Sequence, residues 1–359
     1  MQAPRILVIQ NKRIGDVLIS SVIAANIKKV YPQASISYFV YDYTAGVLEG
    51  NPNIDRIIKA DAKHLKKPGN LMATAVRIRK MKFDIIFDPY GKFQSRLICL
   101  LSTAKIRIGL KRANKKYILP VYTIEQEFLS ATDLDCGKAI LDRVKMVQNH
   151  FELADPDYRP KIFLDTQEKA YNRIDNLPKP VVMMGVLGSS LDKSLPIPYI
   201  VALIDKLTNR EKGTVLFNYA PHQKQLIEEI YSKCTNKDRI HLEVYEDSIR
   251  GFARLMNRCD LLIANEGGSV HIAKALNKPT FTIYSPYIDK AHWASFEKDA
   301  IHHSIHLKEA RPELFKNYDL QERREIMKNP TPWYQQLTPD LIADKLFPYL
   351  DSLNLEEKD

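Results

Sequence analysis

Short apolar runs alternate with segments of helical periodicity along the first half of the chain. The runs that predict β-strands are Arg5–Gln10, Ser35–Val40, Ile54–Ile58, Phe83–Phe87 and Lys105–Ile108. The segments that predict helices are Asp16–Val30, Leu71–Met81, Gln94–Leu101 and Lys138–Phe151. Strands that alternate with helices in this way indicate a parallel sheet with helical crossover connections.

The second half of the chain repeats the alternation after a proline-rich stretch at residues 156–180. Its predicted strands are Val181–Val186, Thr214–Asn218, Ile240–Leu242, Leu261–Ala264 and Thr280–Tyr284. Its predicted helices are Ile197–Thr208, His222–Lys233, Ser248–Asn257, Ser269–Leu276 and Pro339–Leu353. We therefore predict an α/β protein of two tandem Rossmann-like domains, 1–165 and 178–335, that face a cleft. Residues 336–359 form a C-terminal helix that can pack back on the first domain.

Composition agrees with two globular domains. The chain has 359 residues, of which 45% are hydrophobic and 27% are charged. The apolar run at the N-terminus is too short for a signal peptide, and no window approaches the ~18 apolar residues of a membrane span. The four cysteines form no C-x-x-C pair, which favours reduced thiols and a cytoplasmic protein.

Positive charge is concentrated in the first half of the chain. Lys and Arg number 53 against 43 Asp and Glu, a net charge of +10. Residues 59–82 and 105–116 form two basic patches, which indicate an anionic partner unless they are simply solvated surfaces. A nucleic-acid-binding protein is therefore one alternative. Against it, aromatic residues are not interleaved with the basic runs as base-stacking platforms usually are.

The loop after the first predicted strand carries the first candidate for chemistry. It reads Asn11-Lys12-Arg13-Ile14-Gly15-Asp16 and lacks the G-x-G-x-x-G pattern of dinucleotide-binding folds. Asp16 has a structural interpretation, as a helix N-cap or first-turn acid that complements the helix dipole. Its functional interpretation is a carboxylate that faces the cleft and accepts a proton from a hydroxyl group.

Two segments of the second half resemble phosphate-binding loops. After the strand that ends near Val186, Gly188, Ser189 and Ser190 supply backbone and hydroxyl donors, and Lys193 supplies a cation for a diphosphate. A flexible loop with an exposed lysine is the alternative interpretation of this segment.

The other segment runs from Asn265 to Leu276. Here a buried strand enters Glu266, Gly267, Gly268 and Ser269 and then a helix. The free N–H groups at the start of that helix suit a phosphate, and His271 in its first turn could donate to the same anion. A structural histidine is the alternative interpretation of His271.

Taken in order, these segments resemble glycosyltransferase family 9, the lipopolysaccharide heptosyltransferase family. Ile6–Leu18 and Tyr31-Pro32 match its opening I-L-V-I-x-x-x-x-x-G-D-V-L and the later Y-P. Asp88–Ser95 with Arg107-Ile-Gly109 resembles its D-L-Q-G-x-x-x-S and R-I-G segments, and Lys193–Pro196 its K-x-W-P. Asn265–Pro279 resembles its N-D-S/T-G-x-x-H-[IL]-A-A-A-L-x-x-P.

The resemblance implies a GT-B fold and an inverting, metal-independent mechanism without a cofactor. Asp16 matches the catalytic base. Donor contacts fall on Gly188, Ser189, Lys193, Glu266, Gly267, Gly268, Ser269 and His271, and acceptor contacts on Lys12, Arg13, Lys92 and Arg112 of the basic first domain. The family's usual partners are ADP-heptose as donor and the acidic inner core of lipopolysaccharide as acceptor. They imply peripheral contact with the inner-membrane surface and no nucleic-acid partner.

The sequence departs from the family pattern near the donor. Glu266 stands where the family has Asp, Gly267 where it has Ser or Thr, and Leu195 where it has Trp. Pro89-Tyr90 replaces Leu-Gln. Two enzymatic alternatives therefore stay open: transfer from another nucleotide sugar for a different surface polysaccharide, and a sugar-nucleotide epimerase. An inactive transferase is a further alternative.

Overall fold

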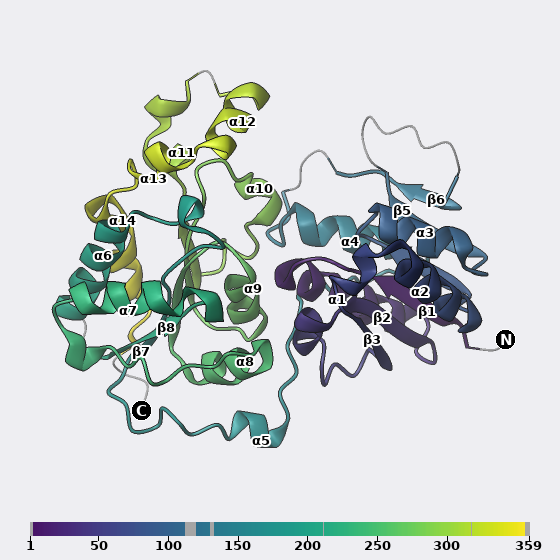
Figure 1. The fold of residues 1–359 in the computed structure, drawn as a ribbon, viewed down its shortest axis with the longest axis horizontal. Helices are drawn as coiled ribbons and strands as arrows, with labels where there is room; N and C mark the ends of the chain where they lie inside the picture. The colour runs from purple at the N-terminus through teal and green to yellow at the C-terminus, as the bar shows by residue number, and fades with distance from the viewer. Residues whose placement is uncertain (1–2, 112–119, 130–132, 211, 317, 356–359) are drawn as a thin grey trace. The chain divides into compact units, whose positions relative to one another are not determined.

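The computed structural model describes residues 3–111, 120–129, 133–210, 212–316 and 318–355. The chain divides into two compact units. The first comprises Met1–Phe163 with the short segment Ala291–Ser295, and the second comprises Leu164–Lys290 and Phe296–Asp359. Figure 1 shows the two units, with most helices and several strands labelled.

Unit 1 is built on a sheet of six parallel strands in the order β3-β2-β1-β4-β5-β6. The strands are β1 Arg5–Ile9, β2 Ser35–Tyr41, β3 Arg56–Ala60, β4 Ile85–Asp88, β5 Ile106–Leu110 and β6 Ile124–Gln126. The strand β1 lies at the centre, with Val8 paired to Tyr38 of β2 and to Phe87 of β4. All of β1 beyond Arg5 is buried, because helices cover both faces of the sheet.

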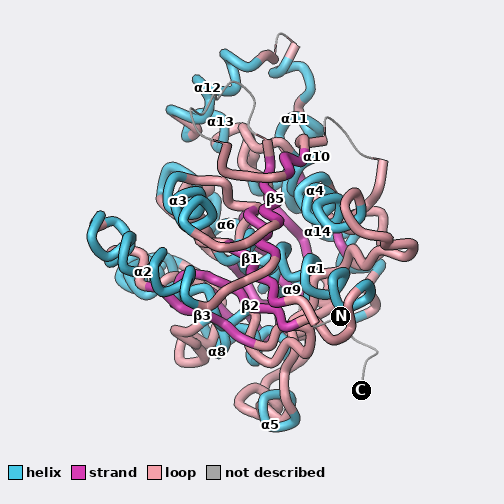
Figure 2. Tube along the Cα trace, turned by 90° about the vertical axis from the view of Figure 1, so that its right-hand side faces the viewer, coloured by secondary structure: helices cyan, strands magenta, loops and turns pink. Residues whose placement is uncertain are grey.

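Four main helices form the outer layers of unit 1. They are α1 Ile14–Val30, α2 Pro68–Lys80, α3 Phe93–Leu101 and α4 Lys138–Gln148, with short 3-10 helices at Asp42–Val47 and His64–Lys66. Figure 2 shows α2 and α3 on one side of the sheet and α1 and α4 on the other. The helices α2 and α3 pack against each other, as do α1 and α4. Unit 1 is therefore a three-layer α/β sandwich.

Unit 2 has a parallel sheet of five strands in the order β11-β10-β9-β7-β8. They are β7 Val181–Gly185, β8 Thr214–Asn218, β9 Leu261–Asn265, β10 Thr280–Ile283 and β11 His302–Ile305. The predicted strand Ile240–Leu242 is wrong, since Ile240 makes only an isolated bridge to Val215. The strands β6 and β11 were not predicted, because neither has a strong apolar run.

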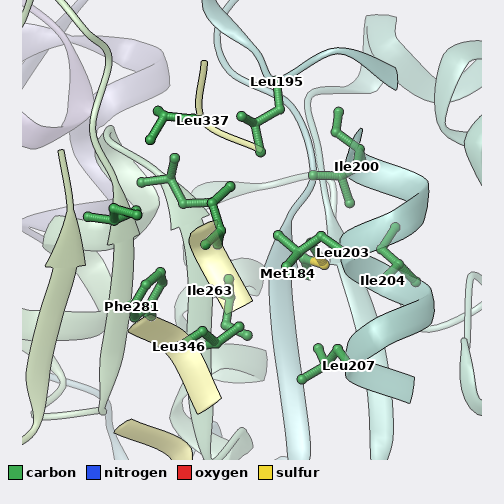
Figure 3. Close-up of a cluster of buried hydrophobic side chains, with 14 of the residues drawn as sticks. Met184, Leu195, Ile200, Leu203, Ile204, Leu207, Ile263, Phe281, Leu337 and Leu346 are labelled. Carbon is green, nitrogen blue, oxygen red and sulfur yellow. The ribbon is translucent and has the colours of Figure 1, made fainter. Parts of the chain in front are cut away.

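The helices of unit 2 cover its sheet and extend into a helical region after β10. They are α5 Thr166–Lys169, α6 Ile197–Arg210, α7 Lys224–Lys233, α8 Ile249–Arg258, α9 Gly268–Ala275, α11 Leu307–Ala310, α12 Leu320–Lys328, α13 Thr331–Tyr334 and α14 Pro339–Ser352. The short helix α10, Lys290–Trp293, belongs to unit 1 except for its first residue. Short 3-10 helices lie at Leu191–Lys193, Pro221–Gln223, Lys237–Arg239 and Pro312–Phe315. In Figure 3, Ile200, Leu203 and Leu207 of α6 point toward the strands around Met184.

The C-terminal helix α14 corrects one expectation. We predicted that it can pack back on the first domain, but it packs on α6 and β11 and belongs to unit 2. Its inner face, which includes Ile342 and Leu346, joins the same hydrophobic cluster as Ile263 and Phe281. An amphipathic helix packs where its apolar face is buried, and for α14 that place is the edge of the second sheet.

Two parallel sheets with helical crossovers confirm the predicted fold class of tandem Rossmann-like units. The four cysteines are buried and free. Within the described ranges, no helix is both long and apolar enough to cross a bilayer.

The packing of α14 predicts a large stability effect at Leu346, which is fully buried. Leu346→Ala should lower the free energy of unfolding of unit 2 by about 2–5 kcal/mol, because it removes buried methyl groups and leaves a cavity. Leu320→Ala, at a side chain that is 71% exposed, should change it by less than about 0.5 kcal/mol. Urea denaturation monitored by fluorescence measures both variants. Equal midpoints would show that α14 does not contribute to the core.

Candidate functional site

Both sheets reverse their strand order beside their first strand. In unit 1, β1 lies between β2 and β4, and in unit 2, β7 lies between β8 and β9. At such a point, the connections that follow two neighbouring strands run in opposite directions. They leave a crevice at the carboxyl ends of the strands, where ligands of α/β proteins bind. Asp16 follows β1, Lys92 follows β4, Lys193 follows β7, and the 266–271 turn follows β9. Each predicted site segment in the described chain thus leaves a strand at one of these points.

Asp16 lies in the first turn of α1 and is 5% exposed. The N-cap of α1 is Arg13, so Asp16 complements the helix dipole without capping the helix. Its Oδ1 atom accepts a hydrogen bond of 2.8 Å from the Lys12 ammonium. Among the described residues, Oδ2 has no hydrogen-bond partner. One carboxylate oxygen is therefore held while the other remains available.

A second cation lies beside the same oxygen. The Arg143 guanidinium, on α4, places Nη2 3.5 Å from Asp16 Oδ1 and donates from Nη1 to the carbonyl of Ala139. Arg143 is almost fully buried, and burial lowers its pKa although the charges of Asp16 and Asp142 raise it. Because an unpaired buried cation would be strongly destabilising, Arg143 and Asp16 stabilise each other. The pair joins positions that are 127 residues apart.

Two amide side chains at the end of β1 have unused hydrogen-bonding capacity. Gln10 and Asn11 are 0% and 2% exposed. Neither the oxygen nor the nitrogen of either amide has a partner among the described residues. Leaving such groups unsatisfied costs about 1–3 kcal/mol each, so native proteins usually pair them. We did not predict these residues, although polar side chains directly after an apolar strand are a recognisable signal.

The predicted acceptor residues have different environments. Arg13 and Lys92 are exposed at the starts of α1 and α3, and the Lys12 side chain is 40% exposed. Lys12 also touches the candidate base, as described above. Arg112 lies outside the described residues.

The turn between β4 and α3 is held by a buried carboxylate. Asp88 accepts hydrogen bonds from the Gly91 N–H at 2.8 Å and from the Tyr122 hydroxyl at 2.6 Å. Gly91 has φ of 57°, a left-handed conformation that glycine adopts without strain. Burial raises the pKa of Asp88, whereas these hydrogen bonds lower it. This part of the family-like motif thus supports the loop that carries Lys92.

The loop after β7 is compact. The Gly188 N–H donates to the Ser194 hydroxyl at 2.9 Å, and that hydroxyl donates to the carbonyl of Ser190 at 2.8 Å. A Cβ atom at Gly188 would lie 2.1 Å from the Lys193 carbonyl oxygen, so only glycine fits there. The loop is therefore closed on itself by these hydrogen bonds and forms a defined turn. Ser189 is exposed on it.

The turn after β9 exposes the start of a helix. Gly267 is the N-cap of α9, whose first turn contains Gly268, Ser269 and His271. A Cβ atom on Gly267 would meet no atom within 4 Å. The first N–H groups of a helix have no intrahelical partner, and here no side chain caps them. The backbone is thus accessible to an anion at this helix terminus.

Glu266 is the centre of a hydrogen-bond network next to this turn. Its carboxylate accepts the Ser285 N–H at 2.8 Å and the Ser285 hydroxyl at 2.7 Å. The Ser285 hydroxyl also bonds the hydroxyl of the buried Tyr334, which donates to the Lys193 carbonyl. Burial raises the pKa of Glu266, and the Ser285 hydrogen bonds and the Lys193 charge lower it. The network links the β9 turn to the β7 loop.

A pair of aromatic rings after β8 was not predicted. Tyr219 and Tyr245 stack with ring centroids 4.2 Å apart and an interplanar angle of 14°. The Tyr245 hydroxyl donates to the Tyr219 carbonyl. Because β8 neighbours β7 in the sheet, this pair lies at the same edge as the closed loop. In the described part of the chain, no three His, Cys, Asp or Glu side chains are grouped to bind a metal ion.

Comparison with known proteins identifies similar sequences and folds. The family model of glycosyltransferase family 9 (heptosyltransferase) matches residues 72–320. The lipopolysaccharide core heptosyltransferase OpsX of Haemophilus influenzae is 22% identical over 79% of this chain and 80% of its own. A family 9 glycosyl transferase from Veillonella parvula superposes with a TM-score of 0.78 at 17% identity over 97% of both chains. The E. coli heptosyltransferase WaaC, solved with ADP-2-deoxy-2-fluoro heptose, has a TM-score of 0.66 at 16% identity over 84% of this chain and 92% of its own.

The raised pKa of Glu266 predicts a pH dependence of stability. Above the ordinary glutamate pKa of about 4.3 and below the raised value, the folded protein keeps a proton that the unfolded chain has lost. The free energy of unfolding should therefore fall as pH rises through this window. Glu266→Gln should remove that slope, as urea midpoints across the window would show. Glu229→Gln, at a half-exposed side chain, should keep the slope. The same slope in Glu266→Gln and the wild type would contradict the assignment.

Proposed function

The chain belongs to glycosyltransferase family 9 and is a glycosyltransferase, and from this membership we propose that it transfers heptose from ADP-heptose to the inner core of lipopolysaccharide. The proposal draws on the names of its relatives, which include a lipopolysaccharide core heptosyltransferase, a lipopolysaccharide heptosyltransferase and an ADP-heptose heptosyltransferase of E. coli. The reaction inverts the configuration of the transferred sugar and needs no metal ion.

One observation carries the proposal. The segments that resemble family signatures leave the carboxyl ends of the strands that flank the two points of strand reversal. Unit 1 has a buried carboxylate there, and unit 2 has an accessible helix terminus beside a lysine loop. An acid in one unit and an anion-binding edge in the other are the parts that hydroxyl activation and diphosphate departure require.

We assign the donor to unit 2. The N–H groups of the Gly267–Ser269 turn, His271 and Lys193 stabilise the charge that develops on the departing diphosphate. Each well-placed donor of this kind contributes a few kcal/mol, roughly 3–4, to the transition state. Ser189, exposed on the adjacent loop, extends the same cradle, and Gly188 allows the close turn that presents it. The Tyr219–Tyr245 pair offers an aromatic surface on which the nucleobase can stack.

We assign the acceptor and the base to unit 1. Asp16 removes the proton from the attacking hydroxyl through Oδ2, while Arg143 orients the carboxylate from the other side. Lys12, with its partly exposed side chain, moves to an acidic group of the acceptor. Its departure frees Oδ1 of Asp16 from that hydrogen bond when the acceptor is bound. Arg13 and Lys92 bind further acidic groups, and the amides of Gln10 and Asn11 bind sugar hydroxyls.

The departures from the family pattern make another nucleotide sugar the second candidate. Glu266, Gly267 and Leu195 are the donor-side residues concerned, and Glu266 is fixed by the Ser285 network rather than free to turn. Thermal unfolding with a panel of nucleotide sugars separates the two, because a ligand at 100 times its Kd adds about 2.7 kcal/mol of stability. ADP-heptose should raise the melting temperature most. A larger shift with another sugar nucleotide would transfer the proposal to that donor.

We place the reaction in the cytoplasm at the inner-membrane surface, where the lipid-linked acceptor is presented. In this placement the contact with the bilayer is peripheral. The basic surface of unit 1 supports this placement.

Replacement of the base tests the mechanism. Asp16→Asn should lower kcat by about 10²–10⁴-fold, because general base catalysis is lost, and should leave ADP affinity unchanged. Asp155→Asn, at a side chain that is 92% exposed in the same unit, is the matched control. Rates come from ADP release and affinities from calorimetry. An Asp16→Asn enzyme with near-normal turnover would exclude this assignment.

Removal of the donor-side cation should have the complementary effect. Lys193→Met should weaken ADP binding by about 10-fold or more, equivalent to 1.4 kcal/mol or more, since a charge-assisted contact to phosphate is lost. Lys233→Met, at a half-exposed side chain of α7, should bind ADP as the wild type does. Unchanged ADP affinity in Lys193→Met would show that the diphosphate binds elsewhere.

A further inference from the structure

The outward face of α2 combines apolar and basic side chains. Leu71, Ala75 and Ile78 face the core, whereas Met72 and Val76, one turn apart, are 46% and 42% exposed. Residues that surround Met72 and Val76 on the helix include Arg77, Arg79 and Lys80, all exposed. A helix with apolar side chains flanked by cations is typical of surfaces that lie in a membrane interface.

The neighbouring helix α3 continues this surface. Phe93 is 74% exposed and Leu100 is 39% exposed. With the partly buried Leu97, they occupy positions i, i+4 and i+7, which lie on one face of a helix. Arg79 of α2 donates from Nη1 to the carbonyl of Leu101 at the end of α3, at 2.8 Å. The two helices lie together on the same side of the sheet (Figure 2).

The described residues do not neutralise the positive charge of this surface. Residues 62–82 contain seven Lys and Arg and no Asp or Glu. None of the seven forms a salt bridge to a carboxylate among the described residues; they are Lys63, Lys66, Lys67, Arg77, Arg79, Lys80 and Lys82. Each cation near an anionic leaflet contributes about 1 kcal/mol to binding. The charge is therefore available to an external anionic surface.

We propose that the outer face of α2 and α3 docks on a bilayer that contains anionic phospholipid. Met72, Val76, Phe93 and Leu100 enter the interfacial region, and the flanking cations contact lipid phosphates. The aliphatic side chains decide between partners, because neither a nucleic acid nor the acid groups of a glycan would bury them. The inference deepens the proposed function, since it names the surface that brings unit 1 to a lipid-linked acceptor.

Sedimentation of the full-length protein with lipid vesicles tests the docking surface. The protein should sediment with phosphatidylglycerol–phosphatidylcholine vesicles and remain in solution with phosphatidylcholine alone. Binding should weaken at high salt, because screening reduces the attraction. Arg77→Gln with Lys80→Gln should lower the partition coefficient by about 10-fold or more, from two contacts of about 1 kcal/mol each. Met72→Ser with Val76→Ser should lower it comparably.

Matched double variants of unit 2 are the controls. Lys224→Gln with Lys233→Gln removes two exposed cations from α7, and Leu320→Ser with Met327→Ser removes two exposed apolar groups from α12. Both should bind vesicles as the wild type does, and all variants should unfold at the wild-type temperature. A wild type that ignores anionic vesicles, or controls that lose equal affinity, would overturn the proposal. So would variants that lose affinity for duplex DNA rather than for vesicles.

The vesicle assay contains no sugar donor or acceptor, so its result is independent of the transferase assignment. Transfer to a delipidated, water-soluble acceptor should proceed at the wild-type rate in the α2 variants, whereas transfer to acceptor embedded in anionic vesicles should fall. Vesicle binding without any transfer would contradict the proposed function alone. Transfer to embedded acceptor that is insensitive to the α2 variants would contradict the docking surface alone.

Discussion

Reversal of strand order beside β1 and β7 is the constraint on which the functional geometry depends. Where neighbouring parallel strands send their chains in opposite directions, the sheet edge is left uncovered by its own connections. Side chains and helix starts at that edge can then meet a ligand without opening the core. This explains why the chemically distinctive segments leave the strands at these points, while the other strands are connected by ordinary helices.

Buried charge at these edges is compensated in two different ways. Asp16 is surrounded by cations, with Lys12 at 2.8 Å and Arg143 at 3.5 Å. Glu266 instead relies on neutral donors from Ser285, and its pKa rises with burial. The first arrangement pairs one carboxylate oxygen with two cations. The second arrangement fixes the conformation of the loop around Lys193 through the Tyr334 hydroxyl. The role of Glu266 is therefore to hold this loop in place rather than to supply a charge.

Much of this organisation could be predicted from the sequence, because local signals were strong. The predicted bounds of β8 agree with the observed ones, because its apolar run has polar residues at both ends. The polar strand β11 and the helices between residues 290 and 334 lack such framing and were missed. Contacts between residues that are far apart in the sequence could not be predicted from local patterns either. Nothing in the sequence near Arg143 indicates that it contacts Asp16. Nor does the sequence around Ser285 and Tyr334 indicate that they hold Glu266.

The position of α14 has a consequence for synthesis of the protein. Ile342 and Leu346 belong to the same apolar cluster as the strands of unit 2, so this cluster stays incomplete until α14 has left the ribosome. Domains generally fold as units during translation, and unit 2 must therefore wait for the synthesis of residues 339–352. A premature stop or an early fusion partner would leave the central strands with exposed apolar surface, and such nascent chains would depend on chaperones.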